Sequence, residues 1–103
     1  MRILILALLF SVFSYGQDIT TVHFNYKWNQ NNTYKGLDRL RGSKVQYAFV
    51  EDQSDAIKKS IKSVPTIMIY KDSRPVAKFE AGLTMEITIR LDSIQAVINK
   101  HKR

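Results

Sequence analysis

The stretch from Val22 to Trp28 reads V-H-F-N-Y-K-W and decides the fold of this chain. Apolar and aromatic side chains alternate with polar ones along it, which is the pattern of a half-buried β-strand. β-Branched residues extend the pattern backwards, so we expect one strand from Ile19 to about Lys27. The polar cluster Asn29–Asn32 follows and is rich in residues that cap helices. This order predicts a strand that runs directly into a helix N-terminus.

A helix and a second strand are predicted next along the chain. Tyr34, Leu37 and Leu40 recur at helical spacing, and Gly42 supplies a natural end to that helix. The segment Lys44–Val50 alternates again and predicts the second strand. A strand, a helix and a strand in succession favour parallel pairing of the two strands through a right-handed crossover.

A second short helix and a hairpin are predicted after this crossover. Ser54 or Asp55 can cap the helix, which ends before Val64-Pro65 because the residue preceding a proline disfavours helical torsions. Two short runs rich in β-branched and aromatic residues then flank a turn-rich connector. The strands are predicted over Thr66–Tyr70 and Val76–Phe79, and the connector over Lys71–Pro75.

The chain is predicted to end in an amphipathic helix over Thr84–Lys100. Gly82 separates this helix from the hairpin, and Thr84 with Glu86 nearby is typical of a helix start. Apolar residues recur along it at helical spacing and form one stripe. The stripe consists of Ile87, Leu91, Ile94, Val97 and Ile98.

Three segments are similar, in this order, to segments of the thioredoxin family. Val22–Trp28 resembles the family's first core strand with its active-site tryptophan, and Ile61–Thr66 resembles the loop that contains its cis-proline. Phe79–Gly82 resembles the strand that ends in the family's glycine. The resemblance covers residues 19–100 and implies an α/β, minimal thioredoxin-like fold. Its four-stranded mixed sheet would be flanked by helices in the order β-α-β-α-β-β-α, without the family's additional N-terminal strand and helix.

The resemblance breaks at the residues that carry the family's chemistry. Asn29 and Asn32 occupy the positions that it assigns to the two redox cysteines, and the sequence has no cysteine. An amide forms no thiolate, so disulfide exchange is excluded. His23 and His101 are too few for a zinc site, and His23 is expected to be packed or hydrogen-bonded. No other catalytic constellation is recognisable, so we expect a redox-inactive domain that is not an enzyme and needs no cofactor or metal.

Residues 1–17 have the layout of a signal peptide. Arg2 precedes an apolar run from Ile3 to Phe13, and small or turn-forming residues lead to Gln17. The run of about eleven residues is shorter than the roughly twenty that a membrane-spanning helix needs. We therefore predict a leader over residues 1–17, an exported domain, periplasmic or secreted, over residues 18–103, and no stable transmembrane anchor. An uncleaved anchor and a buried N-terminal helix are the alternatives.

The resemblance implies a binding groove beside the tryptophan. In redox-active relatives this surface grips an extended peptide by main-chain hydrogen bonds. We therefore expect a protein or peptide partner, bound noncovalently by Trp28, Asn29, Asn32, Val64 and Pro65. Two plainer interpretations stay open. Asn29 or Asn32 can serve as a helix cap, and Trp28 can cover the edge of a small core.

Two other functions compete with peptide binding. The chain is basic, with a formal charge of +7, and its exposed lysines could attract an anionic partner. Aromatic and arginine residues are not interleaved as in proteins that bind single strands, so no specific nucleic-acid binding is expected. The other alternative is a structural subunit of an envelope or virion assembly with a retained N-terminus. The basic residues are Lys58, Lys59, Lys62, Lys100, Lys102 and Arg103.

Overall fold

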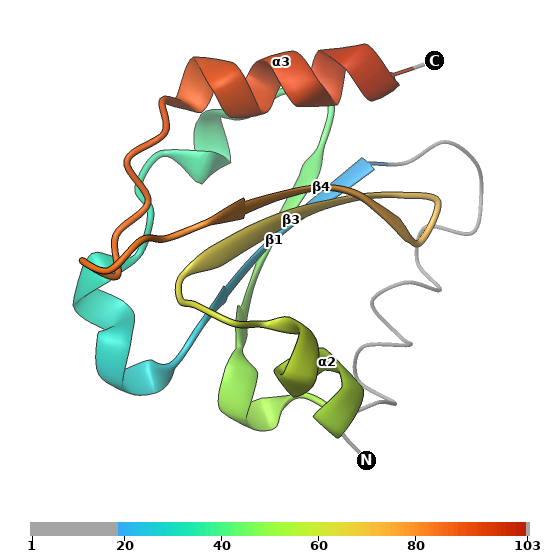
Figure 1. Ribbon diagram of the computed structural model, residues 1–103. Helices are drawn as coiled ribbons and strands as arrows, with labels where there is room; N and C mark the ends of the chain where they lie inside the picture. The colour runs from blue at the N-terminus through green and yellow to red at the C-terminus, as the bar shows by residue number, and fades with distance from the viewer. Residues whose placement is uncertain (1–18, 103) are drawn as a thin grey trace.

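The computed structural model describes residues 19–102, which form a four-stranded sheet with helices on both faces (Figure 1). The strands are β1 (Ile19–Asn25), β2 (Lys44–Phe49), β3 (Thr66–Lys71) and β4 (Arg74–Glu80). They lie in the order β2-β1-β3-β4. β1 pairs in parallel with β2, while the β1–β3 and β3–β4 pairs are antiparallel. This mixed sheet confirms the predicted fold class.

The sheet divides the hydrophobic core into two clusters, because successive side chains of a strand point to opposite faces. β1 is buried along its whole length, as expected of an inner strand covered on both faces. One cluster contains Val22, Phe24, Val50, Ile61, Val64, Met68 and Tyr70. The other contains Ile19, Leu37, Leu40, Ile67, Ile69, Ile94 and Ile98.

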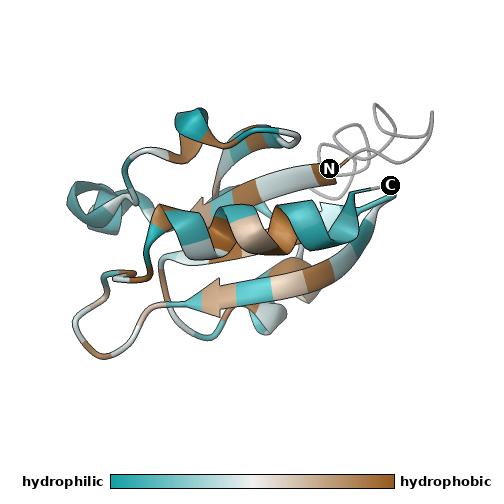
Figure 2. Cartoon of the chain, turned by 90° about the horizontal axis from the view of Figure 1, so that it is seen from above, coloured by the Kyte–Doolittle hydropathy of each residue, from teal (hydrophilic) through white to brown (hydrophobic). Residues whose placement is uncertain are grey.

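A short helix packs over each cluster. The helix α2 (Asp55–Ser60) and the 3-10 turn η3 (Val50–Asp52) lie on one face, and α3 (Leu91–His101) lies on the other (Figure 1). Figure 2 shows apolar residues recurring among hydrophilic ones along α3, as in a helix with one buried face. Ser54 caps α2 as predicted, since its Oγ accepts the Ile57 N–H at 3.3 Å.

The helix predicted between Tyr34 and Gly42 does not form. Within this range the chain forms only the short 3-10 helix η2 (Leu37–Arg39), and another, η1 (Lys27–Asn32), lies just before it. The Tyr34 N–H donates to Nε2 of His23 at 3.0 Å, and this bond replaces one to a helical carbonyl. Gly36 has a φ of 95°, a left-handed conformation that does not continue a helix. The apolar residues of this segment nevertheless reach the core, so their spacing indicated burial but not helix.

The last helix begins at Leu91 and not at Thr84. Met85 has a φ of 60°, which is incompatible with a regular helix through this position. Further along, the Ile89 carbonyl accepts the Tyr34 hydroxyl at 2.6 Å, which fixes this segment against the residues after η1. Ile87 therefore packs on the core from an irregular segment, not from a helical stripe.

The hairpin is tighter than predicted. Lys71 pairs with Arg74, so the turn consists of Asp72 and Ser73 alone. Both turn residues have a positive φ, of 52° and 73°, as in a type I′ hairpin turn. Pro75 belongs to β4 and not to the connector. It lies opposite Tyr70, where the strand register is irregular, on an edge strand that tolerates a residue without an N–H.

The described part of the chain contains no helix that is long and apolar enough to cross a membrane. The leader predicted over residues 1–17, the domain boundary at residue 18 and Arg103 lie outside the described residues. The leader and its boundary therefore stay predictions.

Replacing Ile94 by alanine tests how α3 packs on the sheet. Ile94 is completely buried, so Ile94→Ala leaves a cavity and should lower the free energy of unfolding by about 2–5 kcal/mol. Lys100→Ala, at an exposed position of the same helix, should change it by less than about 0.5 kcal/mol. Urea unfolding followed by circular dichroism measures both values. Similar losses in the two variants would contradict the placement of α3.

Candidate functional site

Side-chain amides hold the segment that follows β1. Asn29 is 5 % exposed, and its Nδ2 donates to Asn25 Oδ1 at 3.1 Å and to the Met85 carbonyl at 3.4 Å. Asn25 Nδ2 donates in turn to the Asn29 carbonyl at 2.9 Å. Asn32 Nδ2 donates to Asn29 Oδ1 at 2.9 Å. This amide cluster of Asn25, Asn29 and Asn32 joins the end of β1, the helix η1 and the segment after β4.

The amide cluster overturns the interpretation of Asn29 or Asn32 as a helix cap. Tyr26 occupies the N-cap position of η1, and no side chain caps that helix. Asn29 lies inside η1 with a non-helical φ of −106°. Its own backbone N–H donates to the Tyr26 carbonyl at 3.0 Å. The α-helix N-terminus with free N–H groups that was expected beside Trp28 is therefore not present there.

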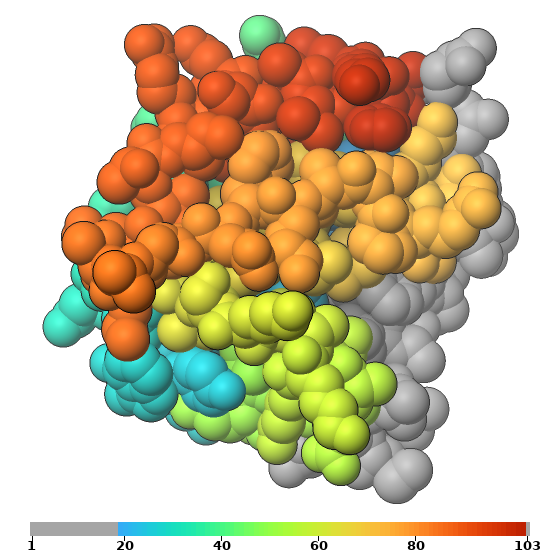
Figure 3. Space-filling view, viewed as in Figure 1, coloured from blue at the N-terminus to red at the C-terminus, as the bar shows by residue number. Residues whose placement is uncertain are grey.

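An apolar groove of about 320 Å³ opens beside Trp28. The Trp28 ring is 64 % exposed and is stacked on Tyr26, with ring centroids 5.7 Å apart and planes inclined by 14°. The segment that follows β4 contributes Leu83 and Met85, and in Figure 3 this orange segment lies beside the teal segment of η1. We call this site the tryptophan groove. It is lined by Tyr26, Trp28, Ile61, Lys62, Ser63, Val64, Gly82, Leu83 and Met85.

The loop before β3 contributes main-chain groups to the tryptophan groove. The Val64-Pro65 peptide bond is cis, as the resemblance implied. The Pro65 carbonyl accepts the Ala81 N–H at 3.1 Å, and the Ser63 carbonyl accepts the Thr66 hydroxyl at 2.6 Å. The backbone N–H and C=O of Val64, by contrast, make no hydrogen bond with residues 19–102. Both groups therefore lack a partner among the described residues, and Val64 itself is 6 % exposed.

The predicted groove residues do not all line the tryptophan groove. Trp28 and Val64 line it together. Asn29 is buried in the amide cluster, and Pro65 is buried behind Val64 in the same loop. Asn32 lines a separate, more polar cavity on the other side of η1. Two of the five predicted residues therefore line the cavity beside Trp28, and three lie outside its lining.

Seven lining residues are missing from the predicted groove, and Leu83 and Met85 are the large exposed apolar residues among them. They are 102 % and 41 % exposed and supply much of the apolar surface of the groove. The signal for them is the presence of two large apolar residues directly after Gly82. The helix start predicted at Thr84 obscures that signal, because it assigns Met85 to the helix and makes Leu83 the residue just before it.

The basic residues lie in separate places. Lys58 and Lys59 are exposed on α2, whereas Lys100 and Lys102 lie at the C-terminal end of α3, over the opposite face of the sheet (Figure 1). These two groups therefore do not form one continuous basic surface. Lys62 is exposed and lines the tryptophan groove.

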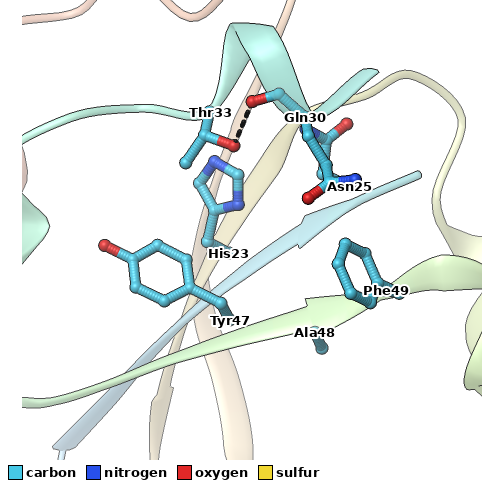
Figure 4. A pocket seen from close by; sticks show the side chains of 7 residues that line it. All are labelled: His23, Asn25, Gln30, Thr33, Tyr47, Ala48 and Phe49. Atoms are coloured by element: carbon cyan, nitrogen blue, oxygen red, sulfur yellow. Dashed lines mark hydrogen bonds between the residues drawn. The ribbon is translucent and has the colours of Figure 1, made fainter. Parts of the chain in front are cut away.

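A second cavity, of about 270 Å³, opens over β1 and β2, beside Gln30 and Thr33 (Figure 4). His23 accepts the Tyr34 N–H there, and its ring lies 5.3 Å from the ring of Tyr47. Burial lowers the pKa of His23 to about 4, so the ring is neutral at pH 7 and carries its proton on Nδ1. We call this cavity the histidine pocket. It is lined by His23, Asn25, Gln30, Thr33, Tyr47, Ala48 and Phe49.

The chemical groups of both cavities support binding. Within residues 19–102, no three His, Asp or Glu side chains gather into a possible metal site. The chain has no cysteine at the positions of Asn29 and Asn32 or elsewhere. The tryptophan groove offers an indole, aliphatic side chains and an ammonium group, which together can hold a ligand by apolar contact and hydrogen bonds.

Comparison with known proteins identifies the fold. No family model and no curated protein matches the chain. A mutant thioredoxin of Halobacterium salinarum superposes with a TM-score of 0.68 at 17 % identity, covering 92 % of this chain and 83 % of that one. A Fasciola hepatica thioredoxin superposes with a TM-score of 0.63 at 17 % identity, covering 94 % of this chain and 91 % of that one. A Plasmodium falciparum thioredoxin superposes with a TM-score of 0.59 at 17 % identity, covering 93 % of each chain. The chain thus has a thioredoxin-like fold without cysteines.

Restoring cysteines at Asn29 and Asn32 tests the geometry of this site. The two side chains are in hydrogen-bond contact, so the double variant Asn29→Cys, Asn32→Cys should close a disulfide under mild oxidation. The reduced variant should be less stable by about 1–3 kcal/mol, because Asn25 loses a buried partner. Mass spectrometry after thiol alkylation reports closure. The pair Asn29→Cys, Asn31→Cys is the control, and equal closure of both pairs would contradict this geometry.

Acid should destabilise the protein through His23. Its pKa is about 4 in the folded state and near 6.5 in the unfolded state, so between these values only the unfolded state binds the proton. The neutral His23 therefore contributes fully to the free energy of unfolding above about pH 6.5. This contribution falls with pH, by roughly 3 kcal/mol once pH 4 is reached. Urea unfolding between about pH 7 and pH 4.5 measures it. In His23→Gln the free energy of unfolding should fall less steeply with decreasing pH than in the wild type. Equal pH dependence of the two proteins would contradict the prediction.

Proposed function

We propose that this domain binds an extended segment of another protein, noncovalently, in the tryptophan groove. The exposed apolar surface of the groove carries this proposal. Trp28, Leu83 and Met85 all line the groove and are 64 %, 102 % and 41 % exposed. Small soluble domains usually bury large apolar side chains, and a group of them around a concave site is typical of an interaction surface.

The backbone of Val64 supports an extended ligand in particular. Its N–H and C=O make no hydrogen bond with residues 19–102, and Val64 lines the groove. A partner strand beside Val64 would satisfy both groups while its side chains contact Trp28 and Leu83, which is binding by strand addition on a small scale. The resemblance to redox-active thioredoxins implies the same mode of peptide binding.

Binding would be reversible because no covalent step is possible through a thiol. The side chains of Asn29 and Asn32 are engaged within the protein, and neither can replace the redox cysteines as a nucleophile. We accordingly propose a binding protein and not an enzyme, with no cofactor. The leader predicted over residues 1–17 would export it to the periplasm or the exterior, where it would meet its partner.

The charge at the groove suggests the composition of the bound segment. Among the described residues that line the groove, Lys62 is the one with a charged side chain, and it is exposed. An aspartate or glutamate next to a bulky apolar residue of the partner would be attracted to it. The expected ligand therefore combines a large apolar side chain with an acidic neighbour.

Replacing Trp28 tests the proposed function. Peptides selected against the wild-type protein from a random display library, labelled with fluorescein, serve as the probe. Trp28→Ala should weaken their binding at least about tenfold, measured by fluorescence polarisation, because an aromatic anchor is lost. Tyr47→Ala, which removes an exposed aromatic ring outside the groove, is the matched control and should bind normally. Equal affinities of Trp28→Ala and wild type would contradict the proposal.

The wild-type protein offers an independent readout of the same site. Trp28 is the only tryptophan in the sequence. Its emission should shift to shorter wavelength when a selected peptide covers the ring, and acrylamide should quench it less. A peptide that binds without changing the emission would show that a different surface is used.

A further inference from the structure

The two edge strands of the sheet differ in how they are protected against pairing with another strand. β4 carries Pro75 and the charged residues Arg74, Lys78 and Glu80, and its register with β3 is irregular at Pro75. Proline, lysine and irregular register are the features with which natural sheets block edge-to-edge association. One edge of this sheet is therefore protected.

β2 has less of this protection. It begins with Lys44, but from Val45 to Phe49 it carries no charge and no proline, and within residues 19–102 the strand pairs with β1 alone. Alternate residues of β2 therefore direct backbone N–H and C=O groups away from the sheet. An uncharged, regular edge of this kind is suited to receive another strand.

The side chains of β2 also form an open surface. Tyr47 is 56 % exposed, although it is a large aromatic residue in the middle of a strand. Tyr47, Ala48 and Phe49 form one wall of the histidine pocket (Figure 4). The unprotected edge and an aromatic cavity are thus continuous along one strand, so an added strand would satisfy the backbone and cover Tyr47 at the same time.

We propose that β2 pairs with β2 of a second copy of this chain, antiparallel about a two-fold axis. The charges at the two ends of the strand favour a second copy over an unrelated strand. Arg41 precedes β2, whereas Asp52 and Glu51, whose carboxylate also accepts the Lys27 N–H, follow it. Antiparallel pairing brings the basic start of each strand beside the acidic end of the other, so the edge is complementary to itself. The two sheets join into one continuous eight-stranded sheet, with the protected β4 strands at its outer edges.

Sedimentation equilibrium of the full chain over a range of concentrations tests this proposal. The mass should rise from one chain to two and no further, because a two-fold interface closes on itself. Tyr47→Lys should weaken dimerisation by roughly tenfold or more. The two-fold axis places the lysines of the two copies close together, and their like charges repel. Leu83→Lys, which alters an exposed apolar residue of the tryptophan groove, is the matched control and should dimerise normally.

A cysteine cross-link tests the position of the axis. The natural chain has no cysteine, so Tyr47→Cys introduces a single thiol at the middle of β2. Mild oxidation should join two copies at a concentration where Leu83→Cys remains uncoupled. A monomer at every concentration, a dimer unaffected by Tyr47→Lys, or equal cross-linking of the two cysteine variants would each overturn the proposal.

Discussion

The buried hydrogen bonds of Asn29 are the constraint on which the candidate site depends. They connect the end of β1 through Asn25 with the segment after β4 through Met85. A buried amide that loses its partners costs about 1–3 kcal/mol, so these segments are stable only when they meet. Trp28 precedes Asn29 directly, and Met85 is itself one of the partners. The amide cluster therefore fixes the positions of the two segments that carry Trp28 and Met85 to the tryptophan groove.

The same region explains how a thioredoxin-like fold can exist here without the family's chemistry. Asn29 and Asn32, which stand at the positions of the redox pair, direct their amides at protein groups. A regular helix does not continue from them, because His23 takes the Tyr34 N–H and Gly36 adopts a left-handed conformation. The histidine pocket lies over β1 and β2, beside His23.

Strands and core were predictable from the sequence because they depend on alternation and apolar content, which are local. Val22 and Phe24 were assigned to a buried strand on that basis, and both are completely buried. Two helix predictions were wrong, the helix between Tyr34 and Gly42 and the helix start at Thr84. Both failed because of tertiary contacts, which the spacing of apolar residues does not reveal. Tyr34 takes part in both, through its N–H to His23 and its hydroxyl to Ile89. The groove was predictable at Trp28 through the resemblance, but Leu83 and Met85 reach it only because the chain remains irregular up to Arg90.

The absence of cysteine has a consequence for the environments in which the fold persists. Zero cysteines leave no cross-link to form or reduce, so noncovalent interactions hold the fold. Its folded state is therefore not changed by glutathione, by thiol reductants or by the thiol–disulfide redox potential of a compartment. A thioredoxin changes state as its surroundings become more or less oxidising. This domain presents the same surface in all of them.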